Sequence, residues 1–190
     1  MGHSQAEKAN SRERILSAAA QQIRESGLEA LSVGGLMKSV SLTHGGFYNH
    51  FSSRNDLIVA ALERALSEGD YSAPPSGVQN KIGTFSALAK SYLSRAHRDS
   101  RATGCAIAAL ASDVARSESG AREVMEDHVE QFIDEFEDAL GDQEAAMVAI
   151  STMVGALILS RVVTDPKRSD AILKSARSYV LALDAASAQG

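Results

Sequence analysis

Residues 42–57, LTHGGFYNHFSSRNDL, constrain the fold of this chain more than any other stretch, because they carry two helix starts in quick succession. Thr43 and Ser53 are both favoured N-cap residues, and Asp56 stands three positions after Ser53, as in a first helical turn. A short helix over residues 44–50 must therefore end before the next helix begins. Such spacing predicts helices that are joined by tight turns.

The short helix carries two adjacent glycines, Gly45 and Gly46. Each costs roughly 1 kcal/mol relative to alanine, which a purely structural helix would not favour. Phe47 and Phe51 are four residues apart and can anchor one side to a core. The residues that project elsewhere are His44, Tyr48 and Asn49. Backbone amides at the start of the following helix, which has Arg54 in its first turn, bind phosphate well. We therefore expect a surface that lies close against another backbone.

The preceding residues complete a three-helix unit. Residues 11–26 carry apolar side chains at helical spacing, and Gly27 follows as a C-cap. Ser32 can cap a second short helix over residues 33–40, and the polar turn 41–43 joins it to the third. Three short helices with a tight turn between the second and third predict a helix-turn-helix.

The pattern LSVGGLMKSVSLTHGGFYNHFSSRNDLI resembles the signature of the tetracycline-repressor (TetR) family of transcriptional regulators, and the match spans about residues 11–66. Two positions depart from the family pattern: Ser41 replaces the usual glycine of the turn and must adopt a left-handed conformation, and Arg54 replaces the usual lysine. The resemblance implies that residues 43–46 enter the major groove and that Tyr48, His50 and Arg54 lie at or near phosphates. The predicted DNA-binding residues are Ser32, Val33, Thr43, His44, Gly45, Gly46, Tyr48, Asn49, His50 and Arg54.

Four of these residues have an alternative interpretation. His44 could lie at the helix start without reading bases. Tyr48 could be a core aromatic with a surface hydroxyl, although the adjacent Phe47 requires one of the two rings to face away. His50 is expected to pack or to bond the backbone rather than to read bases. Arg54 could be an ordinary exposed arginine, but its place at a helix start favours phosphate binding.

Composition limits the remaining possibilities. The chain has 190 residues, 44% of them apolar, so it can form a sizeable core as one domain or as a small head on a larger body. Three prolines and no tryptophan favour helices. A single cysteine excludes an internal disulfide and fits a reducing cytosol. We find no signal peptide and no apolar run that approaches the roughly 20 residues of a membrane span, so we expect a cytoplasmic protein.

The net charge of −5 is unusual for a DNA-binding protein. Through Leu57 the chain carries six basic and five acidic residues, and the rest carries thirteen basic and nineteen acidic residues. The acidity therefore lies in the body, which need not touch DNA. The weakly basic head predicts few phosphate contacts and moderate salt sensitivity.

The expected fold is all-α, with about nine helices: a helix-turn-helix DNA-binding head over residues 1–52 and an effector-binding and dimerisation body over residues 53–190. Residues 72–78, SAPPSGV, break the helical pattern and read as a surface loop. The helices expected in the body cover about 53–69, 80–95, 103–116, 119–140, 143–163 and the stretch after 166. Their apolar stripes supply a predicted effector pocket, with Phe85, Leu88, Tyr92, Cys105, Ile107, Leu110, Met125, Val129, Phe132 and Phe136.

The last two helices differ from the rest. The run MVAISTMVGALILS is apolar almost all round, and such a helix must be covered on both sides. Paired with the terminal helix, it suits a four-helix interface between two subunits of a two-fold dimer. The alternative is a hairpin buried within one subunit. The predicted interface residues are Met153, Gly155, Ala156, Leu157, Ile172, Ala176, Tyr179, Val180 and Leu183.

Two other classes of protein, an enzyme or metal protein and a protein–protein adaptor, make different predictions from the same sequence. The acidic residues 126–138, with His128 among them, could ligate a metal, but they alternate with the apolar stripe of one helix and read as a solvated face. His97 is expected in a polar loop. Neither a G-x-S-x-G sequence nor a phosphate loop occurs, so we expect neither an enzyme nor a metal or cofactor site. A protein–protein adaptor would leave the paired glycines unexplained.

Cys105 has two readings. A lone cysteine in an alanine-rich helix is most often a small buried hydrophobe, but a position near a helix start favours the thiolate. We therefore predict a dimeric TetR-like repressor that a small, mainly apolar effector releases from a pseudo-palindromic double-stranded DNA operator, with no membrane partner. The alternative is a repressor that responds to oxidants or electrophiles through Cys105.

Overall fold

The computed structural model describes residues 5–68, 85–117 and 119–187, and over these ranges the protein is all-helical. Ten helices follow one another there, nine α-helices and one 3-10 helix, η1. Their bounds are α1 (Gln5–Ser26), α2 (Val33–Ser39), η1 (His44–Asn49), α3 (Arg54–Glu68), α4 (Phe85–Tyr92), α5 (Arg95–Asp99), α6 (Ala106–Val114), α7 (Ser119–Leu140), α8 (Gln143–Val162) and α9 (Pro166–Ser187).

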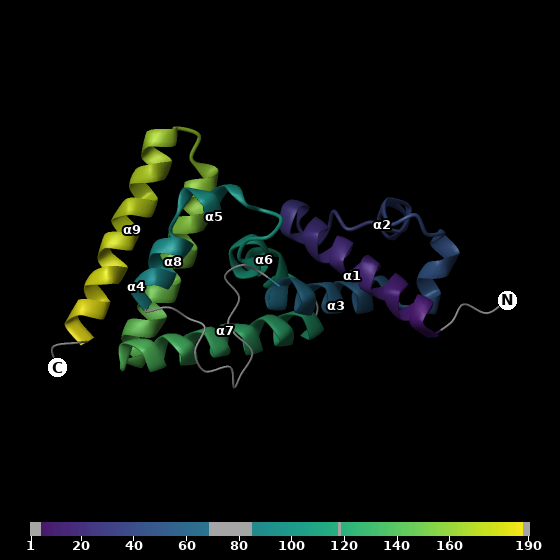
Figure 1. Ribbon diagram of the computed structural model, residues 1–190, viewed down its shortest axis with the longest axis horizontal. Coiled ribbons are helices and arrows are strands. Elements are labelled where there is room, and N and C mark those ends of the chain that lie inside the picture. The colour runs from purple at the N-terminus through teal and green to yellow at the C-terminus, as the bar shows by residue number, and fades with distance from the viewer. Residues whose placement is uncertain (1–4, 69–84, 118, 188–190) are drawn as a thin grey trace.

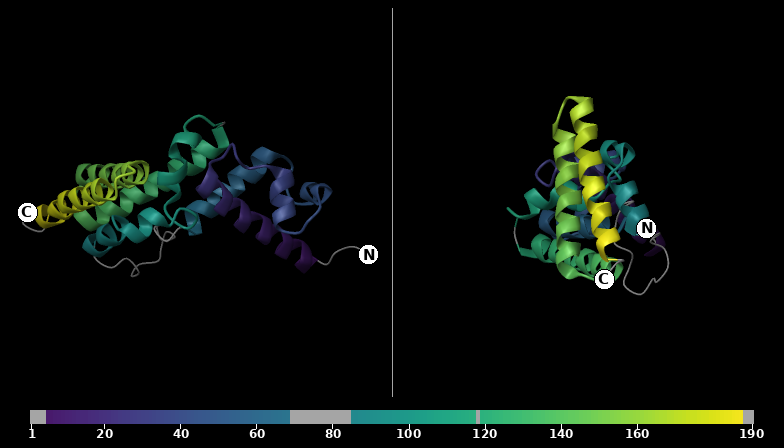
Figure 2. Two further views of the ribbon diagram at one scale, coloured as in Figure 1. Left: turned by 90° about the horizontal axis from the view of Figure 1, so that it is seen from above. Right: turned by 90° about the vertical axis from the view of Figure 1, so that its left-hand side faces the viewer.

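The helices form a head at one end and an antiparallel pair at the other (Figure 1). The head consists of α1, α2, η1 and the start of α3, and the far end is the pair α8 and α9, which lie side by side in both views of Figure 2. α3 packs against α1 on one side and α7 on the other. It therefore links the head to the body, as the sequence predicts for the helix that begins near Ser53.

Local signals place most helix ends. The Ser32 hydroxyl accepts a hydrogen bond from the Gly35 amide at 3.1 Å, which confirms it as the N-cap of α2. Gly27 and Gly141 end α1 and α7 with φ of +84° and +71°, values at which glycine carries no Cβ penalty. The Asp142 carboxylate caps α8 by accepting from the Glu144 amide at 2.8 Å. These ends follow from neighbouring residues alone.

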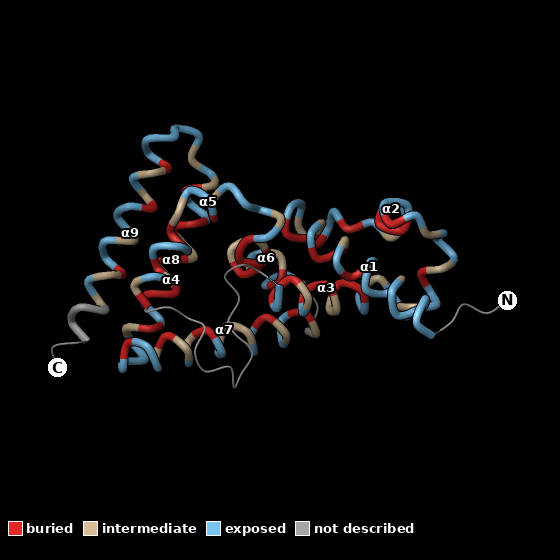
Figure 3. The backbone as a smooth tube through the Cα atoms, in the orientation of Figure 1, coloured by how far each residue is buried: buried red, intermediate tan, exposed pale blue. Residues whose placement is uncertain are grey.

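One continuous cluster of buried apolar residues runs from the head into the body (Figure 3). Ile15 and Leu57 of the head and Leu110 and Leu157 of the body are all fully buried. The predicted boundary between residues 52 and 53 falls just before α3 rather than at a break in this core. The division into two domains therefore remains a proposal.

Some expected elements differ. α1 begins at Gln5, six residues before the predicted start. The helix expected over residues 80–95 is described only from Phe85, and it ends at Tyr92, before α5 begins. The loop predicted over residues 72–78 lies outside the described residues. His97 lies in α5 and is buried, so the expectation of a polar loop was wrong.

α8 is long and apolar enough, by length and composition, to cross a membrane, and among the described helices it alone passes that test. The expectation that no segment approaches this length was therefore wrong. The core helix of a soluble protein passes the same test. α8 packs against α7 and α9, and its Ala149, Met153 and Leu157 are buried between them.

Candidate nucleic-acid interface

η1 begins as the sequence predicts, but it is a 3-10 helix rather than an α-helix. The Thr43 hydroxyl accepts a hydrogen bond from the Gly46 amide at 3.3 Å. Phe47 is buried and stacks on Phe51 with ring centroids 5.6 Å apart. The two phenylalanines therefore fix η1 to the head, and its opposite side is left to solvent.

The turn between α2 and η1 depends on Ser41. Its φ of +57° makes it the single described residue other than glycine in the left-handed region. The Leu42 amide donates to the Met37 carbonyl at 2.8 Å across this turn. The left-handed conformation expected of Ser41 is thus confirmed, and the tight reversal sets η1 against α2.

The exposed side of η1 forms one surface, which we call the recognition surface: Thr43, His44, Gly45, Tyr48 and Asn49. Tyr48 is 67% exposed, and its ring contacts Phe47 and His44 edge-on. A Cβ placed on Gly45 would meet nothing within 4 Å. The fold therefore does not require glycine at position 45, and the missing side chain leaves room for something outside the chain.

The start of α2 borders this surface. A Cβ on Gly34 would lie 3.8 Å from Cδ2 of His44. Ser32 is exposed but uses its hydroxyl as the cap of α2, and Val33 is half-buried. Two of the predicted DNA-binding residues therefore lie beside the recognition surface, without forming part of it.

Arg54 lies differently from the prediction. Its Nε donates to the Leu31 carbonyl at 3.0 Å, and its Nη2 donates to the carbonyls of Leu28 at 2.9 Å and Glu29 at 3.4 Å. The guanidinium thus binds the loop between α1 and α2 to the start of α3. Because its Nε and Nη2 donors are used inside the head, the structure gives Arg54 a packing role, and the phosphate contact expected of it stays a prediction.

His50 ends η1 at the edge of a groove of about 390 Å³ between α1 and η1, lined by Glu7, Lys8, Ser11, Met37, Leu42, Thr43, Gly46, Asn49 and His50. Burial, followed by the nearby charges of Lys8 and Arg12, lowers the pKa of His50. Its Nδ1 is buried and has no partner among the described residues. The expectation that His50 packs fits this position. Lys8 was not among the predicted site residues because the sequence placed the start of α1 at residue 11.

The residues predicted to line an effector pocket are core residues. Leu88 and Val129 are partly buried, and the others are buried. Aromatic rings form the centre of this group, with Phe136 lying 5.3 Å from Phe85 and 5.2 Å from Phe132 between ring centroids. An apolar ligand would have to part these side chains to enter.

The predicted dimer interface divides in two. Met153, Ala156, Leu157 and Val180 are buried within the subunit, whereas Tyr179 is 54% exposed. The other members, Gly155, Ile172, Ala176 and Leu183, are partly buried. The exposed apolar side chains that the prediction missed form what we call the apolar face of α8: Met147, Val148, Ile158, Leu159 and Val162. They recur at helical spacing on one side of α8.

Cys105 precedes the first residue of α6, which is the position that suggested a thiolate. The side chain is buried, and burial raises the pKa of its thiol. Its backbone amide donates to Nε2 of the buried His97 at 3.0 Å. Its burial therefore favours the interpretation of Cys105 as a small buried hydrophobe over that of a reactive thiolate.

At the level of sequence, the similarity to known proteins lies in the head. Residues 15–61 match the family described as bacterial regulatory proteins, tetR family. An uncharacterized HTH-type transcriptional regulator of Bacillus subtilis, YvdT, is 42% identical over 55 residues, which cover 29% of this chain and 28% of YvdT. The matched part thus spans less than a third of that relative.

Solved structures extend the likeness to the whole fold. A TetR transcriptional regulator from Chloroflexus aurantiacus aligns with a TM-score of 0.74 at 19% identity, over 93% of this chain and 96% of that one. A TetR transcriptional regulator from Legionella pneumophila aligns with a TM-score of 0.71 at 22% identity, over 95% of this chain and 97% of that one. The reduced form of E. coli NemR aligns with a TM-score of 0.70 at 20% identity, over 90% of this chain and 95% of that one.

Two-fold dimers that bind DNA are typical of this family, which consists of regulators rather than enzymes. The helix-turn-helix around Ser41, the family match over residues 15–61 and the fold shared along the whole chain agree with one another. The head, residues 15–61, matches the tetR family of bacterial regulatory proteins, and the described chain has the fold of solved TetR regulators.

Proposed function

We propose that this protein binds a pseudo-palindromic DNA operator as a two-fold dimer, represses transcription in the cytoplasm, and leaves the operator when a small, mainly apolar effector binds the body. The observation that carries the proposal is the recognition surface. Its glycine at position 45 has no neighbour within 4 Å, and its Tyr48 is a large aromatic held at 67% exposure. The packing of the head leaves the space at Gly45 and most of the Tyr48 ring open to solvent, whereas close approach to a DNA backbone uses both.

The recognition surface would enter the major groove with His44 reading base edges and Tyr48 at a phosphate. Lys8 and Arg12 of α1 lie close enough to His50 to lower its pKa, and they supply positive charge beside the groove between α1 and η1. These cations replace Arg54, whose guanidinium is occupied by backbone carbonyls. Each head would then make few phosphate contacts, which agrees with its small positive net charge.

The apolar face of α8 supports the dimer. Val162 is 71% and Leu159 is 57% exposed, and Tyr179 of α9 is a further exposed apolar side chain on this pair of helices. Leaving such side chains in water costs about 25 cal/mol per Å² of apolar area. Pairing α8 and α9 with the same helices of a second subunit would cover them and would set two heads for half-sites roughly 34 Å apart.

Contacts between the head and the body support the proposed release. Arg24, near the end of α1, donates to the Ala65 carbonyl of α3 at 3.0 Å and to the Ala102 carbonyl of the loop before α6. The Leu28 amide donates to the Asp113 carboxylate of α6 at 3.1 Å. A shift of α6 would therefore move the head. An apolar effector among Phe85, Phe132 and Phe136 would drive release only if it binds better to the shifted conformation.

The DNA-binding part is tested with an operator selected from randomised duplexes and titrated by mobility shift. Tyr48→Ala should lower the affinity for all DNA sequences by a similar factor. His44→Ala should reduce the difference in binding free energy between the preferred base and other bases by roughly 1–3 kcal/mol. Gln21→Ala, an exposed change in α1, serves as the control. Unchanged binding by Tyr48→Ala and His44→Ala would refute the docking.

The effector part is tested by reciprocity. Apolar compounds that stabilise the protein in a thermal-shift screen are titrated again with operator present. The operator should weaken compound binding by the same factor by which the compound weakens operator binding. Independent binding of the two would refute effector-driven release.

A further inference from the structure

A polar cavity of the body lies where α5 meets the turn between α8 and α9. Its volume is about 320 Å³, and its lining consists of Arg98, Asp99, Arg101, Ser160, Arg161, Val163, Thr164, Pro166 and Ser169. Three arginines and one aspartate line this cavity, so its lining carries an excess of positive charge in a chain whose net charge is −5. The proposed DNA docking uses none of these residues.

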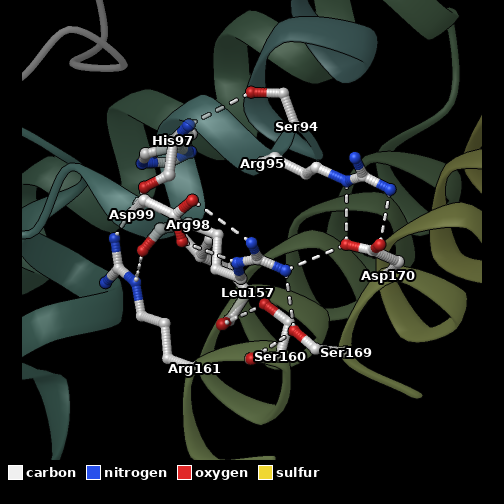
Figure 4. Close-up of polar contacts among 10 residues, drawn as sticks. All are labelled: Ser94, Arg95, His97, Arg98, Asp99, Leu157, Ser160, Arg161, Ser169 and Asp170. Atoms are coloured by element: carbon white, nitrogen blue, oxygen red, sulfur yellow. Dashed lines mark hydrogen bonds and ion pairs between the residues drawn. The ribbon is translucent and has the colours of Figure 1, made fainter. Parts of the chain in front are cut away.

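Arg98 is already neutralised. Its Nε donates to Asp99 at 2.8 Å, and its Nη1 donates to Asp170 at 3.0 Å and to the Ser169 hydroxyl at 2.9 Å. Figure 4 shows its guanidinium between these acceptors. Asp170 also accepts from Arg95 at 2.9 Å. The acidic groups near the cavity are thus satisfied by Arg95 and Arg98.

Arg161 has no such counter-ion. Its Nε donates to the Arg98 carbonyl at 3.0 Å and its Nη2 to the His97 carbonyl at 3.1 Å, and both carbonyls appear beside it in Figure 4. Within the described residues no carboxylate lies within 4.0 Å of it. Burial lowers the pKa of its guanidinium. The charge of Arg101 acts in the same direction, while Cys105, Tyr92 and Asp99 act against it. The fold therefore holds a partly buried cation in a fixed orientation beside a second cation.

We propose that this cavity binds a small oxyanion, the carboxylate or phosphate group of a small molecule, through Arg161 and Arg101. Guanidinium groups match the planar, multiple acceptors of such anions and bind them by charge-assisted hydrogen bonds. Arg101 is exposed, and its side chain makes no hydrogen bond or ion pair within the described residues, so it is available to close over the anion. The anion would compensate the charge that the fold leaves unpaired at Arg161.

Calorimetric titration of the wild-type protein with inorganic phosphate and, separately, with acetate tests the site, with chloride at equal ionic strength as the reference. Saturable one-to-one binding of one of these anions is expected, and the better anion identifies the preferred group. Arg101→Gln should weaken it by about tenfold, because a charged hydrogen bond is lost. Arg161→Gln should weaken it at least as much, while Arg122→Gln, an exposed change in α7, should leave it unchanged.

Arg101→Gln keeps the test decisive if Arg161→Gln disturbs folding, because the Arg101 side chain makes no hydrogen bond or ion pair within the described residues. Two results would overturn the proposal: neither phosphate nor acetate binds beyond the chloride reference, or both bind equally well to wild type and Arg101→Gln, as adventitious ions would. The titration requires no DNA, so its failure is distinguishable from failure of the proposed operator binding.

Discussion

The recognition surface and the apolar face of α8 are both exposed, but they differ in what would cover them. The first combines polar side chains, one aromatic ring and a glycine with free space around it, whereas the second is formed by aliphatic side chains at helical spacing. Polar groups and a missing side chain suit a hydrated, charged backbone, and aliphatic groups suit a dry interface. The same chain therefore carries two surfaces completed by different chemistry.

The largest effect is expected at the apolar face. Leu159→Glu would place an unpaired charge in the dry interface and should cost roughly 3–5 kcal/mol of association free energy per subunit. Sedimentation should show a monomer or aggregate, while Ala139→Glu, at an exposed position of α7, should stay dimeric. A dimeric Leu159→Glu variant, or a monomeric wild type at micromolar concentration, would show that α8 is not the interface.

Arg54 tests where the recognition surface ends. Because its guanidinium bonds carbonyls of Leu28 and Leu31, Arg54→Ala should lower the free energy of unfolding by about 1.5–3 kcal/mol. The folded fraction should still bind operator with nearly wild-type affinity. Denaturant unfolding and titration of the same samples separate the two effects, with Asn55→Ala as control. A stable Arg54→Ala protein that binds operator weakly would indicate that Arg54 contacts DNA phosphate.

A smaller effect is expected from a charge outside both surfaces. Burial, and then the neighbouring Asp138, raise the pKa of Glu135 from 4.5 to about 7. A raised carboxyl pKa means that the folded state favours the protonated form, so its contribution to stability is complete below pH 4.5 and is lost as pH rises to about 7. Glu135→Gln should remove this loss, about 1–2 kcal/mol after allowance for partial exposure. Parallel pH profiles for wild type and variant would contradict the shift.

Local signals explain which features the sequence predicts well. The caps at Ser32 and Thr43, the left-handed Ser41 and the end of α7 at Gly141 each depend on a few neighbouring residues, and all were predictable. The resemblance to the TetR family rests on the same stretch. The helix-turn-helix and the family match of the head therefore follow from this stretch alone.

The remaining features depend on contacts between distant parts of the chain. α8 is apolar almost all round, so its sequence does not say that Leu157 faces its own subunit and Leu159 faces outward. Arg54 is basic at a helix start, and only the position of the loop at Leu28–Leu31 shows that its Nε and Nη2 donors bind backbone carbonyls. Burial of Cys105 and His97 likewise follows from packing, and no short motif encodes it.

Gly45→Ala tests the central claim most directly, because position 45 has free space in the folded protein and is proposed to face DNA. The variant should be as stable as wild type or up to about 1 kcal/mol more stable, since alanine favours helix over glycine. Its operator affinity in a mobility-shift titration should nevertheless fall by about tenfold, because the added methyl group would occupy the space that the groove requires. A stable Gly45→Ala protein with wild-type operator affinity would contradict the account.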